Sequence, residues 1–180
     1  MKIGIISDIH GYPKKFKSAL SYLKDCNIVL CAGDILYHGP RNPILEGYDP
    51  LQLVEEIKNC PIPMLIAKGN CESEVDLMVL DLPMISDYVV YEKDGVRFIV
   101  NHGHHHDMNS LQNLAKVYKA DVIITGHTHV RTHDVIEGVH YINPGSISVP
   151  KGDGIPSLCI YEDGNVTFIN LNNGENLIYN

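Results

Sequence analysis

The chain has 180 residues, of which 44% are hydrophobic and 20% are charged, and its net charge at pH 7 is -8. This composition excludes a disordered or collagen-like chain and predicts one folded domain over residues 1–180. The chain has no run of basic residues, so it lacks the positive surface that binding of an extended nucleic acid requires. Bound divalent cations would nevertheless make the protein surface positive around their own site.

No apolar run is long enough to span a bilayer, and the chain opens on a strand-like segment rather than a secretion signal. The five cysteines are odd in number and scattered, and none lies in the close pair typical of zinc fingers. We therefore expect reduced thiols, a cytoplasmic protein and no membrane partner.

The first part of the chain alternates between buried strands and amphipathic helices. Strands are predicted at residues 2–7, 27–32 and 64–67, and helices at residues 13–24 and 49–59. In the second helix, Leu51, Val54 and Ile57 are expected to share the buried face. This alternation predicts parallel strands, and ligands collect at the carboxyl ends of such strands.

Hairpins dominate the rest of the chain. An irregular loop is expected over residues 35–50 and a helix near residues 72–80. Two-residue turns are predicted at Asp94-Gly95, between strands 88–93 and 96–101, and again at Glu137-Gly138 and Asp163-Gly164. A helix at 108–118 and a strand at 121–125 separate the first two turns. We expect a mostly antiparallel second half and two packed sheets with helices outside.

Five polar clusters each follow a predicted buried strand. Asp8 and His10 lie two residues apart and share a face, and Asp34 follows a glycine at the end of the next strand. Taken singly, these are also explained as a helix cap, a solvated histidine and a turn residue. Asn70 follows the third strand, where it offers a neutral oxygen ligand or caps the next helix.

Histidines characterise the other two clusters. His102 and His104 lie in Asn-His-Gly-His after a strand, and His127 and His129 lie in Gly-His-Thr-His after another. Two imidazoles separated by one residue present nitrogen ligands from one short segment, whereas core histidines are more often isolated. The second segment is the strongest indication of metal binding in the chain.

Together the clusters offer seven oxygen or nitrogen donors, more than one four-ligand zinc site can use. The donors are Asp8, His10, Asp34, Asn70, His102, His127 and His129. Such a set suits two divalent transition ions that share a bridging carboxylate and leave positions open for water and substrate. Because no thiolate cluster is among them, we expect Mn, Fe, Ni, Co or Zn rather than copper(I) or an iron–sulfur cluster.

The ordered set of motifs resembles that of the calcineurin-like metallophosphoesterase superfamily, and more narrowly its YfcE-type bacterial phosphodiesterases. The motifs are SDIHG, CAGDILYHGPRN, GNCESEVD, HGH, GHTH and NPGS, within residues 1–150. The resemblance implies an α/β fold, a four-layer α-β-β-α sandwich of two mixed sheets. It also implies a dinuclear centre in which Asp8, His10 and His129 hold one metal, Asn70, His102 and His127 hold the other, and Asp34 bridges them.

The implied activity is hydrolysis of phosphodiester bonds in a small substrate, with a metal-bridging hydroxide as the nucleophile and manganese as the first expected metal. The family often has a histidine where this chain has Cys71, although the YfcE-type branch shares the cysteine. A thiol is a weaker proton donor, so Cys71 either slows catalysis or is a passive small residue. His104 is a second candidate catalytic residue, and His105 and His106 are expected to be solvated loop residues or rim contacts.

The residues leave two alternatives, a phosphomonoesterase for a small metabolite and a non-catalytic scaffold such as the retromer subunit that resembles this family. A competent donor at every ligand position argues against the scaffold. His38, Arg41 and Asn42 are expected to form one pocket wall, where Arg41 contacts a phosphate oxygen or is instead a solvated or interface residue. The exposed strands of such a sandwich favour a homo-oligomer.

Overall fold

The computed structural model describes residues 1–82 and 85–177, which contain four helices and eleven strands. In chain order they are β1 (Lys2–Ile6), α1 (Pro13–Leu23), β2 (Ile28–Cys31), α2 (Pro50–Lys58), β3 (Met64–Ile66), α3 (Glu74–Leu80), β4 (Tyr88–Lys93), β5 (Val96–Asn101), α4 (Met108–Tyr118), β6 (Val122–Ile124), β7 (Arg131–Ile136), β8 (Val139–Pro144), β9 (Ser157–Glu162), β10 (Asn165–Asn170) and β11 (Asn176–Leu177). Every predicted element is present, and no end differs from its predicted position by more than two residues.

The first sheet has the strand order β11-β10-β9-β1-β2-β3. β1, β2 and β3 are parallel, as the alternation of strands and helices predicts, and Ile5 pairs with Leu30 in this register. On the other side of β1, β9 runs antiparallel to it. The sheet is therefore mixed, and its three N-terminal strands point in one direction.

The second sheet has the strand order β4-β5-β6-β8-β7. The predicted hairpins β4–β5 and β7–β8 form its two edges. At its centre, however, β5, β6 and β8 run parallel, so the expectation of mostly antiparallel pairing fails there. The hairpin turns predict antiparallel pairing only for the two strands that each turn connects. Between β5 and β6 the chain crosses over through α4, which makes these two strands parallel.

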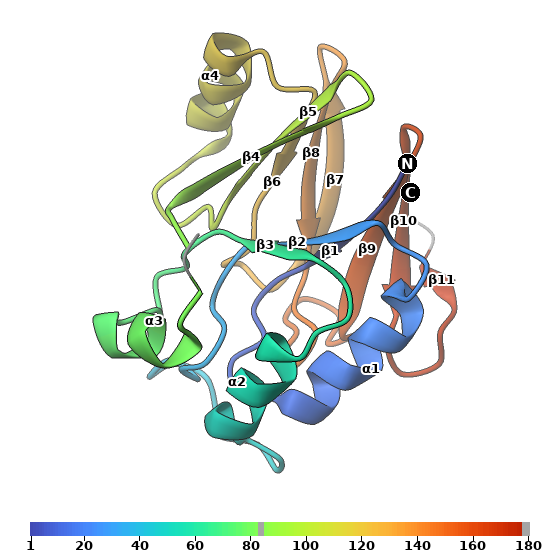
Figure 1. Ribbon diagram of the computed structural model, residues 1–180. Helices are drawn as coiled ribbons and strands as arrows, with labels where there is room; N and C mark the ends of the chain where they lie inside the picture. The colour runs from blue at the N-terminus through green and yellow to red at the C-terminus, as the bar shows by residue number, and fades with distance from the viewer. Residues whose placement is uncertain (83–84, 178–180) are drawn as a thin grey trace.

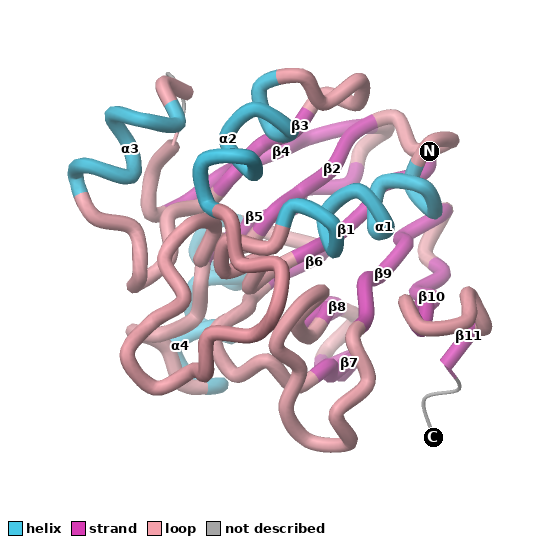
Figure 2. Tube along the Cα trace, turned by 90° about the horizontal axis from the view of Figure 1, so that it is seen from below, coloured by secondary structure: helices cyan, strands magenta, loops and turns pink. Residues whose placement is uncertain are grey.

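The two sheets pack face to face and helices cover their outer faces. Phe98 of β5 and Tyr161 of β9 are buried between the sheets, with ring centroids 5.1 Å apart and ring planes at 90°. Figures 1 and 2 show α1 and α2 on one side of the strands and α4 on the other. The expected four-layer α-β-β-α sandwich of two mixed sheets is confirmed.

Local chemistry sets where the helices begin. The Asp49 side chain accepts a hydrogen bond from the first turn of α2, and Ser73 forms a reciprocal cap with Asp76 at α3. Ser73, not Asn70, is thus the cap of the third helix. The predicted face of α2 is wrong in one position, because Leu51 is 71% exposed and Leu53 is buried in its place. None of the helices in the described part combines the length and apolar character that a membrane span requires.

The strand directions bring distant loops together. The loops after β1 and β2 meet the loops after β5 and β6, as two hydrogen bonds between the sheets show. The His127 N–H donates to Asp8 Oδ2 at 3.1 Å, and His102 Nδ1 donates to the Ala32 carbonyl at 2.6 Å. The polar clusters therefore share one edge of the sandwich.

Removing the Phe98 ring tests the contact between the sheets. We predict that Phe98→Ala lowers the free energy of unfolding by about 3–5 kcal/mol, because the fully buried ring would leave a cavity between the two sheets. Urea titration followed by circular dichroism measures the change. Val117→Ala on α4, where the side chain is 61% exposed, is the control and should change stability by less than about 0.5 kcal/mol. A similar loss in both variants would contradict the role of Phe98.

Candidate metal centre

All seven sequence-predicted donors come together where the strands end. The first sheet supplies Asp8 and His10 after β1, Asp34 after β2 and Asn70 after β3. The second sheet supplies His102 after β5, and His127 and His129 after β6. The carboxylates and three of the imidazoles are buried, while Asn70 is exposed and His127 is half-buried. The site is thus covered by protein around its carboxylates and open to solvent on the side of Asn70 and His127.

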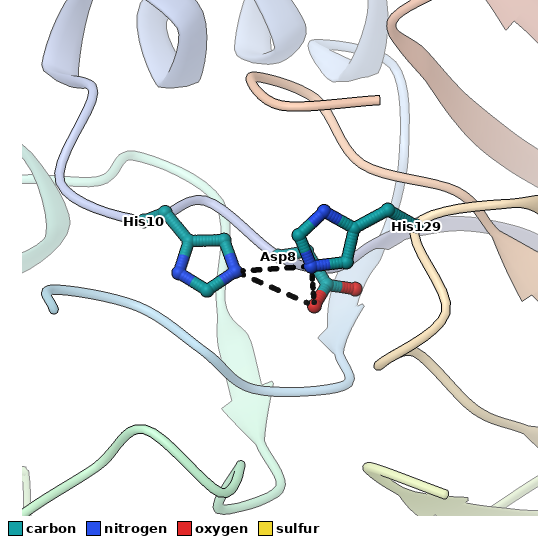
Figure 3. A group of neighbouring side chains, drawn as sticks. All are labelled: Asp8, His10 and His129. Carbon is teal, nitrogen blue, oxygen red and sulfur yellow. Dashed lines mark hydrogen bonds and ion pairs between the residues drawn. The ribbon is translucent and has the colours of Figure 1, made fainter. Parts of the chain in front are cut away.

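Asp8, His10 and His129 form the first half of the site. The two imidazole Nε2 atoms lie 3.2 Å apart, and Asp8 Oδ1 lies 3.2 Å from Nε2 of His129 and 3.7 Å from that of His10. Figure 3 shows the three side chains pointing at one another from two separate loops. Three donor atoms therefore surround one point.

Asp34 joins this half of the site to the second. Its Oδ2 lies 3.6 Å from Nε2 of His10 and 3.3 Å from Nε2 of His102. On the far side, Asn70 Oδ1 lies 3.0 Å from Nε2 of His102 and 2.7 Å from Nδ1 of His127. The carboxylate thus lies between two groups of donors, where the resemblance to the family implies a bridge.

Backbone carbonyls fix which imidazole nitrogen faces the site. A carbonyl oxygen only accepts, so each ring that contacts one through Nδ1 donates its proton there. The pairs are His10 with Tyr37 at 2.7 Å, His102 with Ala32 at 2.6 Å and His129 with Val149 at 2.7 Å. In the neutral rings each Nε2 therefore presents a lone pair to the centre, the arrangement found around histidines that bind metals.

This donor set fits divalent cations. Asp8 Oδ1 is buried and has no hydrogen-bond partner among the described residues. Asp8, His10 and His129 each place one ligand atom within 4.8 Å of the other two, and so do Asp8, Asp34 and His102. Without positive charge between them, the lone pairs of two imidazoles and a carboxylate repel one another at these distances. Mixed oxygen and nitrogen donors suit borderline transition ions.

The shifted pKa values of Asp8 and His102 also show that the site favours positive charge. Burial alone would raise the pKa of Asp8, but the imidazoles of His10 and His129 beside its carboxylate hold that pKa well below its ordinary value. Burial opposes a charge on His102 as well, yet its hydrogen bond with Asp34 raises its pKa to about 9. A divalent cation bound there would supply this charge in place of the protons.

The backbone is held in an unfavourable conformation around the site. Left-handed φ angles occur at Asp8 (54°), His10 (49°), Asp34 (56°), His127 (69°) and His129 (58°). For residues with a side chain this region costs on the order of 1–3 kcal/mol each, and such strain persists only where the surroundings enforce it. The loops are therefore constrained to present their ligands.

Glu72 supplies part of that constraint, and sequence reasoning overlooked it. Its buried carboxylate accepts hydrogen bonds from the backbone N–H groups of Asp34 (3.0 Å), Ile35 (2.5 Å) and Gly69. Gly69 has no room for a side chain, because a Cβ there would lie 2.1 Å from Asp34 Oδ1. The acidic residue two positions after Asn70 was the available signal for this contact.

A serine-rich segment after β8 supports the loop of Asp8 in the same way. Ser146 and Ser148 donate to the Asp8 carbonyl at 2.7 and 3.1 Å, and Asn143 donates to the Gly126 carbonyl at 2.7 Å. The motif NPGS was noted in the sequence, but no role followed from it. These polar side chains position the ligand loops from behind.

A cavity of about 180 Å³ opens at the exposed side of the centre. Arg41 and Asn42 line it as expected for the 35–50 loop, and Lys151 joins them from a distant loop that the sequence did not single out. His38 is not among the lining residues, since its ring packs edge-on against Tyr37 and Tyr48 instead. Two cationic side chains thus line the cavity together with the Asp34 carboxylate.

The two predicted catalytic residues lie on different sides of the centre. Cys71 lines the 180 Å³ cavity, and its N–H donates to Asp34 Oδ1 at 2.9 Å. Burial and the neighbouring Asp34 carboxylate raise the pKa of its thiol, which is therefore protonated. The ring of His104 lies 5.4 Å from that of His102 and 6.0 Å from that of His127, facing another cavity. His105 is exposed, as expected for the rim.

Comparison with known proteins identifies the family. The model of the calcineurin-like phosphoesterase superfamily domain matches residues 1–164. Phosphodiesterase YfcE of Escherichia coli K12 is 33% identical over 176 residues, which cover 96% of this chain and 93% of the relative. A solved structure of the E. coli phosphoesterase Yfce superposes with a TM-score of 0.86 at 29% identity, over 99% of this chain and 97% of that one.

Two further relatives are more distant. Phosphodiesterase MJ0936 of Methanocaldococcus jannaschii is 28% identical, over 81% of this chain and 83% of the relative. The Vps29 protein of Entamoeba histolytica, solved with Zn²⁺, shares the fold with a TM-score of 0.67 at 20% identity, over 98% of this chain and 96% of that one.

The chain belongs to the calcineurin-like phosphoesterase superfamily, whose members depend on divalent metals, and it is a phosphoesterase.

Proposed function

We propose that this protein hydrolyses phosphodiester bonds in small substrates with the help of two divalent cations, manganese first among them. The main support is the position of Asp34 between two groups of donors, where its Oδ2 lies 3.6 Å from Nε2 of His10 and 3.3 Å from Nε2 of His102. Asp8, His10 and His129 would hold one cation, and Asn70, His102 and His127 the other. One carboxylate touching both groups favours a metal pair over a single ion.

Cations held there would supply an activated water as nucleophile and neutralise charge on the phosphoryl oxygens. The chain itself positions the substrate. Arg41 and Lys151 border the cavity from two loops, where their charges would attract a phosphate despite the net charge of -8. Diesters are proposed rather than monoesters because the relatives YfcE and MJ0936 are both named phosphodiesterases.

Three broader expectations accompany this proposal. A single domain over residues 1–180 stays a prediction. A cytoplasmic location is proposed because all five cysteines carry free thiols. A homo-oligomer is proposed because the outermost strands of the second sheet expose Val90 (57%) and Val135 (56%).

Metal dependence tests the function. We predict that protein treated with a chelator and dialysed hydrolyses bis(p-nitrophenyl) phosphate only after Mn²⁺ is added back, as measured by p-nitrophenol release. Fe²⁺, Ni²⁺, Co²⁺ and Zn²⁺, assayed in parallel, rank the metals. A faster rate on p-nitrophenyl phosphate would favour a monoesterase, and no metal-stimulated turnover on either substrate would favour a non-catalytic scaffold.

Asp34→Asn tests the bridge. The amide keeps the shape but loses the charge shared by both cations, so we predict that kcat/KM falls by more than about 100-fold and that bound manganese falls from two ions per chain. Metal analysis of the same sample gives the stoichiometry. Asp134→Asn, an exposed position on β7, is the matched control and should behave like the parent. Two tightly bound ions and full activity in Asp34→Asn would contradict the assignment.

Cys71→His tests the weak-donor hypothesis. An imidazolium donates a proton more readily than the protonated thiol, so we predict that kcat on aryl phosphodiesters rises by about tenfold or more in the manganese-loaded variant. Steady-state kinetics at matched metal content measure the change. Cys71→Ser introduces no imidazole and should bring no such gain. An unchanged or lower kcat in Cys71→His would indicate that Cys71 is a passive small residue.

A further inference from the structure

The loop between β8 and β9 brings Lys151 to the candidate metal centre. Residues 151–154 of this loop are all exposed, so packing in the core does not fix their path. Lys151 nevertheless lines the 180 Å³ cavity together with the candidate ligands His127 and His129. A lysine on a freely moving loop would lose much conformational freedom on contacting a phosphate, and this loss would weaken binding. The position of Lys151 therefore depends on contacts that the loop makes outside the core.

Three contacts join this loop to the segment that carries His129. Nδ1 of His129 donates to the Val149 carbonyl at 2.7 Å, and the Lys151 N–H donates to the His129 carbonyl at 3.0 Å. Beyond Lys151, the carboxylate of Asp153 forms an ion pair with the guanidinium of Arg131. The loop is thus joined to the ligand segment before, at and after Lys151.

The ion pair between Arg131 and Asp153 is bidentate. Nη1 of Arg131 donates to Oδ1 of Asp153 at 2.9 Å, and Nη2 donates to Oδ2. Arg131 is the first residue of β7, where it pairs with Pro144 of β8, and its side chain is only 17% exposed. Many exposed ion pairs contribute little, but a bidentate pair fixes both the distance and the orientation of its partners. Arg131 therefore ties the exposed loop to a fixed point on the second sheet.

Asp153 also shapes the loop itself. Its Oδ1 accepts a hydrogen bond from the Ile155 N–H at 3.1 Å, and the Gly154 N–H donates to the Lys151 carbonyl at 3.3 Å. These two bonds close a turn that begins at Lys151. Glycine accommodates the left-handed φ angles of this turn, which are 68° at Gly152 and 74° at Gly154. A change at Asp153 would therefore be felt at Lys151.

We propose that Asp153, held by Arg131, is a positioning residue that keeps Lys151 directed at the phosphate of the substrate. The proposal rests on the proposed phosphodiesterase function and adds a residue to it. Asp153 is not among the described residues that line the cavity, so it acts through Lys151 and does not touch the substrate. Its negative charge, which would otherwise repel a phosphate, is balanced by Arg131.

Asp153→Asn and Lys151→Ala, made singly and together, test the proposal. With bis(p-nitrophenyl) phosphate and manganese-loaded protein, we expect Asp153→Asn to raise KM by about threefold to tenfold while kcat stays within about twofold of the parent. In the Lys151→Ala background the same change should have no further effect, because the side chain that it positions is gone. A parent-like KM in Asp153→Asn, or additive losses in the double variant, would overturn the proposal.

Two further variants complete the kinetic test. Arg131→Gln should raise KM at least as much as Asp153→Asn, because it also leaves the Asp153 charge unbalanced, and a parent-like KM in this variant would contradict the proposal. Asp163→Asn is the matched control, since Asp163 is an exposed carboxylate that pairs with the N-terminal amino group at 2.7 Å, away from the candidate ligands. It should keep the parent KM.

Hydrogen exchange measures the order of the loop and needs neither metal nor turnover. In metal-free Asp153→Asn we expect the backbone amides of Lys151 and Gly154 to exchange at least about tenfold faster than in the parent. The melting temperature, and the manganese bound after reloading, should stay at the parent values. Unchanged exchange rates would rule out the positioning role. A loss of bound manganese would rule it out too, because it would show that the ion pair supports the metal site instead.

Binding of inorganic phosphate separates this proposal from the proposed function. Calorimetric titration of the manganese-loaded proteins with phosphate should show the same loss of affinity in Asp153→Asn and in Lys151→Ala. If the parent hydrolyses no diester in the presence of metal, the proposed function fails, and the phosphate affinities still decide the role of Asp153. A parent that binds phosphate no more tightly than Asp153→Asn would contradict that role.

Discussion

The structure depends on electron-pair donors that converge on a point they cannot share without positive charge. His10 and His129 approach to 3.2 Å through Nε2 atoms whose rings donate their Nδ1 protons to backbone carbonyls, and the Asp8 carboxylate completes the group. Asp34 extends this arrangement to His102. Repulsion among such donors would spread the loops apart if nothing held them, so the fold must supply restraint from outside the site.

Two parts of the fold supply this restraint, the strands of the sheets and the polar side chains behind the ligands. Parallel strands at the centre of both sheets aim six loops at one edge, and the core between the sheets fixes the strands. Behind the ligands, Glu72 ties the Asp34 loop to the Gly69 loop, and Ser146 ties the Asp8 loop to the second sheet. These contacts hold the left-handed backbone at Asp8 and Asp34 in the conformation that presents their carboxylates.

Much of this could be predicted from the sequence because short motifs encode it. Apolar runs and Asp-Gly turns predict the strands, and the polar residues at their ends predict all seven donors. The parallel pairing of β5 with β6 follows from the strand–helix–strand order around α4 and was overlooked, whereas the parallel pairing of β6 with β8 depends on contacts distant in sequence. Lys151 escaped notice for a similar reason, because a lone lysine matters only through its neighbours in space, and these come from other loops.

The central claim is a pair of cations joined by one carboxylate, and anomalous diffraction from manganese-replete crystals tests it most directly. The account predicts two peaks about 3.5–4 Å apart. One should lie among Asp8, His10 and His129, the other beside His102, and Asp34 should contact both. A single peak, or ligand side chains turned away from an empty centre, would contradict it.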